Sequence, residues 1–242
     1  MELKVLGSSS SGNCYILDNG NEALIIEAGI RFLEVKKALG FNLRKVVGCL
    51  ITHQHNDHAK YIKTMVDNGF FTLALPEVWT AKGVWGSRSK AIEPGKGYKF
   101  GNFKVLPFAA SHDVPCVGYL ITHSDCGKIM FLTDSCSCDY RFSGLNQVLI
   151  ECNYSDKKLV EAINDGRTLL SQRERLLTSH LELNACKNFL ADNDLTDVQN
   201  IVLLHLSDNN SDEPFFVSEI ERLTGKVVYA ARPGLTLNIN RI

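Results

Sequence analysis

No apolar run in the 242 residues approaches the roughly 20 residues that a membrane-spanning helix needs. The first segment, Met1–Gly7, lacks the positive stretch and the long apolar run of a signal peptide. Low-complexity tracts and linkers rich in proline, glycine or serine are also lacking. We therefore expect a cytoplasmic protein without a membrane segment, folded as a single domain over residues 1–242.

The chain also lacks paired cysteines and a strong net charge. None of its 8 cysteines forms a CxxC pair, and free thiols are the default without a secretion signal. The one cluster, Cys136-Ser137-Cys138, predicts small buried residues rather than a thiol ligand or a redox pair. The net charge of −1 provides no overall attraction for a polyanion, so any contact with nucleic acid needs a local basic patch.

Hydrophobic residues make up 45% of the chain and charged residues 22%, which is typical of a globular protein. Short apolar segments between turn signals predict strands at Leu3–Leu6, Tyr15–Leu17, Ala23–Ile26, Val46–Thr52, Phe71–Ala74, Phe103–Phe108, Val117–Ile121, Lys128–Leu132, Gln147–Glu151, Asn200–Leu206, Val227–Ala230 and Leu235–Ile239. Helical spacing predicts helices at Arg31–Leu39, Tyr61–Asn68, Lys157–Asn164, Asn184–Asp192 and Pro214–Leu223. Runs of strands with interspersed helices favour an α/β fold, an αββα sandwich of two mixed β-sheets flanked by helices.

The hexapeptide His53-Gln54-His55-Asn56-Asp57-His58 directly follows an apolar run that predicts a buried strand. Imidazole and carboxylate are ligands that suit Zn²⁺, Mn²⁺ or Fe²⁺. Alternate residues of a short loop can converge on one metal ion, while Asp57 and His58 turn toward a second. The alternative is a polar surface loop that happens to be rich in histidine.

Three further ligand-type residues lie at the ends of predicted strands: His112, Asp134 and His205. Each of them alone is more often a hydrogen-bonded structural residue. Together with the hexapeptide they predict polar side chains converging on one edge of a sheet. Two metal ions held there would lower the pKa of bound water and neutralise charge that builds up on a phosphoryl or carbonyl oxygen.

The series His-x-His-x-Asp-His, followed by His, Asp and His, resembles the ligand order of the metallo-β-lactamase superfamily, which consists mostly of dinuclear metal hydrolases. The resemblance implies two divalent transition-metal ions, either Zn²⁺ or Mn²⁺, with Fe²⁺ as a further option. It assigns His53, His55 and His112 to the first ion and Asp57, His58 and His205 to the second. Asp134 would bridge the two ions.

One position departs from that pattern. The superfamily usually has Asp-x-Gly after the third strand, where the aspartate orients the metal ligands, whereas this chain has Glu27-Ala28-Gly29. The extra methylene shifts the carboxylate by about one bond length, which retunes a hydrogen bond to a ligand without abolishing it. We expect Glu27 to support a metal ligand from behind.

Further along, Glu151 and the segment Ser179-His180-Leu181-Glu182 resemble motifs of the phosphodiesterase branch that includes tRNase Z. There a Glu–His pair serves the leaving group, so the resemblance implies Asp57, Glu151 and His180 as catalytic residues. Ser179-x-x-Glu182 also predicts a capping box, which would place His180 at a helix N-terminus that favours a phosphate oxygen. The alternatives are a surface histidine at a helix start and a solvated carboxylate.

Five segments together resemble the WalJ (YycJ) group of metallo-β-lactamase-fold proteins, which are linked to nuclease activity. They are Gly7–Tyr15, the hexapeptide, Ser111-His112-Asp113, Ser179-His180-Leu181 and His205-Leu206-Ser207. The match runs from residue 3 to about residue 240. From it we expect Ser10, Asn13 and Ser179 to contact the substrate.

The segment Lys82–Lys104 is basic. It contains Lys82, Arg88, Lys90, Lys96, Lys99 and Lys104 against Glu93 alone, with Trp85 and Tyr98 interleaved. Basic and aromatic residues together can follow a nucleic-acid backbone and stack bases, although such a run is also typical of a solvated face. The chain has no insertion long enough for the tRNA-gripping arm of tRNase Z.

The leading hypothesis is a metal-dependent hydrolase, a phosphodiesterase or nuclease that acts on nucleic acid, with DNA favoured. The first alternative is a phosphodiesterase that opens a small cyclic phosphate. The second is a weakly active regulatory or binding protein with the same fold, for which Glu27 is the only support in the sequence.

Overall fold

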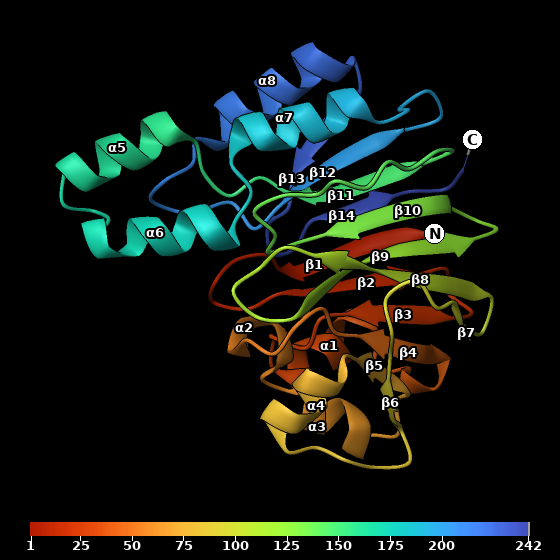
Figure 1. The fold of residues 1–242 in the computed structure, drawn as a ribbon. Helices are drawn as coiled ribbons and strands as arrows, with labels where there is room; N and C mark the ends of the chain where they lie inside the picture. The colour runs from red at the N-terminus through yellow and green to blue at the C-terminus, as the bar shows by residue number, and fades with distance from the viewer. Residues whose placement is uncertain (242) are drawn as a thin grey trace.

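The computed structural model describes residues 1–241, in which two seven-stranded β-sheets pack face to face and helices lie outside them (Figure 1). This arrangement confirms the predicted αββα sandwich. The predicted strands and helices are all present, and their ends are shifted by at most two residues.

The first sheet has the strand order β14-β1-β2-β3-β4-β5-β6. Its members are β14 (Thr236–Asn238), β1 (Glu2–Gly7), β2 (Cys14–Asp18), β3 (Ala23–Ile26), β4 (Val46–Leu50), β5 (Thr72–Ala74) and β6 (Ser89–Ala91). Pairing is antiparallel from β14 to β3 and parallel from β3 to β6. Every residue of β2 and β3 is buried, because these strands lie at the centre of the sandwich.

The second sheet has the order β13-β12-β11-β10-β9-β8-β7. Its members are β13 (Val227–Ala230), β12 (Asn200–Leu204), β11 (Gln147–Glu151), β10 (Gly127–Leu132), β9 (Cys116–His123), β8 (Phe103–Ala110) and β7 (Tyr98–Phe100). Strands β10 to β13 are parallel, and β7 to β10 are antiparallel. Tyr15 of β2 meets Phe131 of β10 edge to face at 5.2 Å, which joins the two sheets through the core.

Helices cover the outer faces of both sheets (Figure 1). The first sheet carries α1 (Phe32–Ala38), α2 (Asn56–Ala59), α3 (Ile62–Asp67) and α4 (Pro76–Lys82), and the second carries α7 (Leu183–Asp192) and α8 (Glu213–Thr224). The pair α5 (Asp156–Asn164) and α6 (Leu170–Ser179) projects to one side. Among residues 1–241, none of the helices has the length and apolar character to cross a membrane.

The sequence patterns did not predict five elements: the short α2, α4, β6 and β7, and the longer helix α6. Strands β6 and β7 have three residues each, which is too short for an alternating pattern. Helix α6 buries Ser179 alone, so it has no apolar face that a sequence pattern could reveal.

The predicted capping box at Ser179 is wrong. Ser179 is the last residue of α6, and its hydroxyl donates to the carbonyl oxygen of Arg175. Helix α7 begins later, at Leu183, and its N-cap is Glu182, whose carboxylate accepts from the backbone N–H groups of the first turn. His180 therefore follows the C-terminus of α6 and lies at no helix N-terminus.

Asp18 joins the N-terminal strands to the segment before β4. Its carboxylate accepts hydrogen bonds from Lys4 Nζ and Lys45 Nζ, each at 2.7 Å. Burial alone would raise the pKa of Asp18, but the hydrogen bonds from the two lysines outweigh it and lower the pKa below its ordinary value. The charged carboxylate therefore stabilises the fold.

Asp18→Asn should lower the free energy of unfolding by about 1–3 kcal/mol at pH 7, because two ammonium groups lose their charged partner. Since the folded-state pKa is depressed, this stabilisation is present above the unfolded-state pKa and is lost as the pH falls through the folded-state value. Urea unfolding at pH 7 and in acid measures both effects. Asp67→Asn, which removes an exposed pair with Lys63, is the control and should cost less than about 1 kcal/mol. Equal losses in the two variants would contradict the interpretation.

Candidate active site

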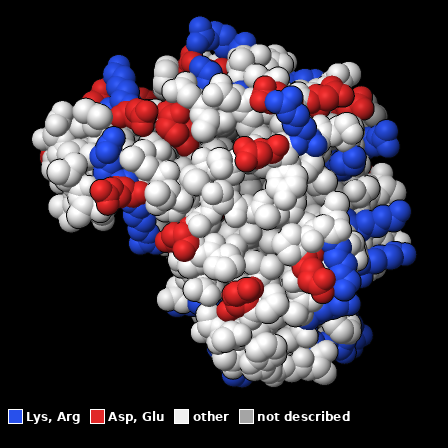
Figure 2. Space-filling model, in the orientation of Figure 1, with Lys and Arg blue, Asp and Glu red and all other residues white. Residues whose placement is uncertain are grey.

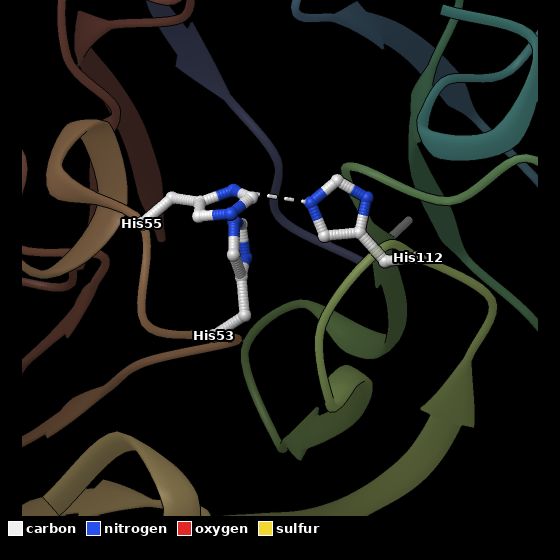
Figure 3. Close-up of side chains that lie close together, drawn as sticks. All are labelled: His53, His55 and His112. Carbon is white, nitrogen blue, oxygen red and sulfur yellow. Dashed lines mark hydrogen bonds between the residues drawn. The ribbon is translucent and has the colours of Figure 1, made fainter. Parts of the chain in front are cut away.

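The hexapeptide turns from the end of β4 into helix α2, and this turn brings its first two histidines together. His53 is fully buried, and its ring lies 4.7 Å from the rings of both His55 and His112. His112 enters from the loop after β8, and its Nε2 lies 3.3 Å from Nδ1 of His55 (Figure 3). Three imidazoles from two loops therefore converge on one point.

A second group lies next to the first and consists of Asp57, His58, Asp134 and His205. Nε2 of His58 lies 3.2 Å from Oδ2 of Asp57 and 3.4 Å from Oδ2 of Asp134. Nε2 of His205, which follows β12, lies 3.5 Å from the same oxygen of Asp57. The four ligand atoms lie within 4.8 Å of one another.

Asp134 stands between the two groups. Its Oδ2 lies 3.9 Å from Nε2 of both His53 and His112, and its Oδ1 lies 3.9 Å from Nε2 of His205. The residue follows β10 with a positive φ of 49°, a left-handed conformation that is uncommon outside glycine. This turn directs the carboxylate into the space that the histidines share.

The donor set fits divalent metal ions. Ligands at about 2.1 Å from a tetrahedral ion lie about 3.4 Å apart, and the closest donor pairs have this spacing. Nε2 of His53 and Nε2 of His205 are buried without a hydrogen-bond partner among residues 1–241, although buried polar atoms normally have one. A bound cation would satisfy both atoms.

Both aspartates carry the negative charge that metal ligation requires. Burial alone would raise the pKa of Asp57, but the neighbouring rings of His205 and His58 lower it well below the ordinary range. Asp134 is likewise buried, and the positive potential of His205 and His58 outweighs the effect of burial on its pKa. The two carboxylates are therefore anionic at neutral pH.

Neighbouring groups contact the second ring nitrogen, Nδ1, of three of these histidines and so fix the orientation of the rings. Nδ1 of His53 lies 2.9 Å from Thr52 Oγ1, and Nδ1 of His112 lies 2.9 Å from the carbonyl oxygen of Ser179. The side-chain amide of Asn153 lies 3.0 Å from Nδ1 of His205. Contacts of this kind set the tautomer and the orientation of a ligand ring.

Glu27 contacts His58 in the same way. The carboxylate is fully buried, with Oε1 3.3 Å from Nδ1 of His58 and Oε2 accepting from the backbone N–H of Thr52 at 3.4 Å. Its φ of 68° is another left-handed conformation. The longer side chain thus reaches a ligand ring from behind.

The N-terminal loop packs against the hexapeptide at very short range. The backbone N–H of Asn13 donates to the carbonyl oxygen of Asp57 at 2.7 Å, and a Cβ at Gly29 would lie 1.7 Å from the same oxygen. Only glycine fits there. Nδ2 of Asn13 lies 2.9 Å from Nε2 of His58.

The residues expected to contact the substrate separate into two kinds. Ser10 lines the cavity above the two ligand groups. Asn13 and Ser179 are fully buried: Asn13 contacts Nε2 of His58, and the carbonyl oxygen of Ser179 contacts Nδ1 of His112, so both pack against the histidines of the site.

The cavity over the ligand groups has a volume of about 420 Å³. One wall comes from α6 and the segment before it, through Thr168, Gln172 and Arg175, and another from Asn209 and Asn210. Nε of Arg175 lies 3.7 Å from Oδ2 of Asp113, at the rim. The sequence did not indicate these residues, because α6 has no apolar face and the asparagines lie in a loop.

His180 and Glu151 form a close pair in the same cavity. Nδ1 of His180 donates to Oε1 of Glu151 at 2.7 Å, while Oε2 of Glu151 accepts from the backbone N–H groups of Ser135 and Leu181. The His180 ring stacks on the His205 ring at 5.3 Å. Burial lowers the pKa of His180, but the negative charge of Glu151 outweighs it and raises the pKa to about 9.

Comparisons with known proteins find similarity to metal-dependent hydrolases. The family model described as Metallo-beta-lactamase superfamily matches residues 9–125. The chain is 26% identical to the exodeoxyribonuclease YycJ of Bacillus anthracis over 234 residues, which cover 88% of this chain and 85% of that protein. It is also 26% identical to the exodeoxyribonuclease WalJ of Streptococcus pneumoniae over 189 residues, which cover 72% of this chain and 69% of that protein.

Among solved structures, Zn²⁺-bound PqqB from Methylobacterium extorquens aligns with a TM-score of 0.74 at 14% identity, covering 98% of this chain and 100% of that chain. At this identity the likeness concerns the fold. The predicted resemblance to the WalJ (YycJ) group is confirmed at the level of sequence similarity.

The two ligand groups lead to a prediction about metal content. The purified protein should hold two divalent ions per chain, Asp134→Ala should lose both, and His112→Ala should lose one, because Asp134 alone faces both groups. Elemental analysis and metal titration measure the content, and circular dichroism controls for folding. A folded wild-type protein that holds no ion and binds none on titration would refute the prediction.

Glu27→Gln should weaken metal affinity by about 10–100-fold, because a neutral amide orients the His58 ring less firmly than a carboxylate does. Competition with a chelator measures this affinity. Glu22→Gln is the matched control, since Glu22 is another buried carboxylate that contacts a histidine, His123, at 2.9 Å. If both variants bind metal like the wild type, Glu27 is structural only.

Proposed function

Because the chain carries a metallo-β-lactamase domain, we propose that it is a metal-dependent phosphodiesterase that cleaves nucleic acid, with DNA as the favoured substrate. The observation that carries this proposal is the His180–Glu151 pair, which lies beside the two ligand groups in one cavity. Acyl transfer at a metal centre has no evident use for such a pair, whereas phosphodiester cleavage needs an acid for its alkoxide leaving group.

In this proposal His53, His55 and His112 would hold one ion and Asp57, His58 and His205 the other, with Asp134 between the two groups. Zn²⁺, Mn²⁺ and Fe²⁺ all suit these nitrogen and oxygen donors. Ions bound there would lower the pKa of water and neutralise charge on the phosphoryl oxygens.

The side chains of this protein have separate tasks around the phosphate. The negative charge of Glu151 raises the pKa of His180 and so favours the protonated ring, which would hold its second proton on Nε2. Glu151 fixes the ring through Nδ1, so Nε2 is free to give its proton to the leaving oxygen. Arg175 at the rim offers a guanidinium group, which suits a phosphate oxygen next to the scissile bond.

The names of the two similar proteins, both exodeoxyribonucleases, support DNA as the substrate. A small cyclic phosphodiester is the second candidate, because a cavity of about 420 Å³ falls within the usual range for small-molecule sites. A weakly active regulatory protein is the third candidate. It finds little support, since Glu27, the one departure from the superfamily pattern, contacts a ligand ring.

A panel of substrates tests the proposal. Labelled DNA, a cyclic nucleotide and bis-p-nitrophenyl phosphate are compared with and without a chelator. Metal-dependent cleavage of DNA at a kcat/KM well above that for the cyclic nucleotide supports a nuclease. The reverse order would favour the small-molecule phosphodiesterase, and no turnover of any diester by metal-loaded protein would refute both.

His180→Ala should slow the cleavage of DNA by about 10²–10⁴-fold, because the leaving alkoxide loses its acid. The same change should slow nitrophenyl ester cleavage much less, since nitrophenolate leaves without protonation. Metal content should be unchanged, because this ring belongs to neither ligand group described above. Equal slowing of both substrates would indicate phosphate binding instead, and loss of metal would make His180 a ligand.

A further inference from the structure

Basic side chains gather at the end of the sandwich opposite the candidate active site. They are Arg88, Lys90, Lys99, Lys104 and Lys128, here called the basic surface, and they line two adjoining cavities of about 530 and 590 Å³ that share Lys99. Neither cavity has an acidic residue in its lining. Figure 2 shows lysine and arginine side chains along the side of the molecule where Figure 1 places β7, away from α2 and α6.

The cations of this surface are free to bind a ligand. In the part of the chain from residue 1 to 241, no carboxylate forms an ion pair with any of the five, and Nζ of Lys128 donates to the carbonyl oxygen of Ser143. A cluster of unpaired cations is suited to a polyanion.

Aromatic rings are interleaved with these cations. The guanidinium of Arg88 lies 4.1 Å from the centre of the Phe71 ring, and Nζ of Lys90 lies 5.5 Å from that of Tyr98. Phe71 is 43% exposed. Rings and cations in alternation bind single-stranded nucleic acid, because unpaired bases stack while phosphates pair with the cations.

Strand β8 leads from the basic surface to the active site. Lys104 near its start pairs across the sheet with Thr122, which in turn pairs with Lys128, so these side chains share one face. Leu106, the next residue on that face, is 38% exposed, whereas Phe108 after it is buried beneath Tyr140 and Phe142. Two residues beyond the end of β8 the chain reaches His112.

A further aromatic residue stands along this path. The Tyr140 side chain is 44% exposed, and its ring lies 5.3 Å from that of Phe108 and stacks with Phe142 at 6.0 Å. Tyr140 also lines a separate cavity of about 450 Å³, in the loop that follows Asp134. The outer face of β8 therefore offers a ring between the basic surface and the active site.

We propose that the basic surface is a second binding site for single-stranded nucleic acid, and that the strand runs along β8 past Tyr140 to the active site. This inference rests on the proposed function and adds that the substrate is a single-stranded polymer bound at two places. The eight residues of β8 extend about 23 Å at 3.3 Å per residue, a distance that a strand stacked at the B-form rise of 3.4 Å covers with about seven nucleotides and an extended strand with fewer. Oligonucleotides longer than this should bind at both ends of the path, and shorter ones at the active site alone.

The test uses the triple variant Lys90→Gln, Lys99→Gln and Lys104→Gln, with fluorescent oligo-dT of 20 and of 4 nucleotides as probes. The 20-mer should bind the variant at least about 10-fold more weakly, and the slope of log K against log salt should fall by about 2, since each phosphate contact to a single strand contributes about 0.7. Binding of the 4-mer and hydrolysis of bis-p-nitrophenyl phosphate should stay unchanged.

The matched control removes three other exposed cations, Lys37→Gln, Lys63→Gln and Arg222→Gln, for the same change in net charge. Equal loss of 20-mer binding in variant and control would overturn the proposal, because net charge alone would explain it. Loss of 4-mer binding in the variant would also overturn it, as would weaker binding of a 20-base-pair duplex with no change for the single strand.

Tyr140→Ala tests the path itself. It should weaken 20-mer binding by about 10-fold with the 4-mer unaffected, and Tyr140→Phe, which keeps the ring, should restore binding. An unchanged 20-mer affinity in Tyr140→Ala would refute the path. Binding is measured separately from cleavage, so the two ideas can fail separately. If 20-mer binding depends on the basic surface but no diester is turned over, the proposed function is refuted. If diesters are turned over but 20-mer binding does not depend on the basic surface, this inference is refuted.

Discussion

The burial of negative charge is the constraint on which the rest of the structure depends. Glu27, Asp134 and Glu151 lie almost entirely out of water, and no lysine or arginine of residues 1–241 forms an ion pair with any of them. Their contacts are histidine rings, backbone N–H groups and, for Asp134, the hydroxyl of Thr133. A buried carboxylate is costly unless charge compensates it, so the electrostatics of the fold favour cations at this point. Divalent metal ions bound between these groups would complete a charge balance that the protein alone leaves open.

The sandwich provides the geometry for this balance. Each strand that leads into the site ends at the same edge, and three residues that follow strand ends have left-handed backbones: Glu27 after β3, Asp134 after β10 and His205 after β12. Such conformations cost about 1–3 kcal/mol each and persist only where the surroundings enforce them. At these three positions the left-handed turn directs the side chain into the site, whereas an extended backbone would direct it elsewhere. The two sheets thus determine where the ligands meet.

The sequence predicts the sandwich and the convergence of the His and Asp side chains on one edge, because both depend on strong local signals. Buried strands are continuous apolar runs, and a hexapeptide such as His53–His58 has few uses besides metal binding. The prediction fails where tertiary contacts decide. Ser179 and Glu182 match a capping box, yet Ser179 closes α6, a helix with no apolar face. Asn13 lies in an open-looking polar loop, yet close packing buries it against the ligands. The cavity wall around Arg175 had no local signal at all, since it forms only when α6 folds over strand ends distant in sequence.

The close approach at Gly29 connects the site with the whole N-terminal region. No atom beyond hydrogen fits between this residue and the carbonyl of Asp57, and Asn13 donates to the same oxygen. The loop before β2, the loop after β3 and the start of α2 therefore move as one unit. Whatever holds Asp57 in place also holds the first strands in place. By thermodynamic linkage, the resistance of those strands to unfolding rises with the concentration of free metal ion, by RT ln(1 + [L]/Kd). In a cell, the lifetime of the folded chain would then depend on the supply of the ion.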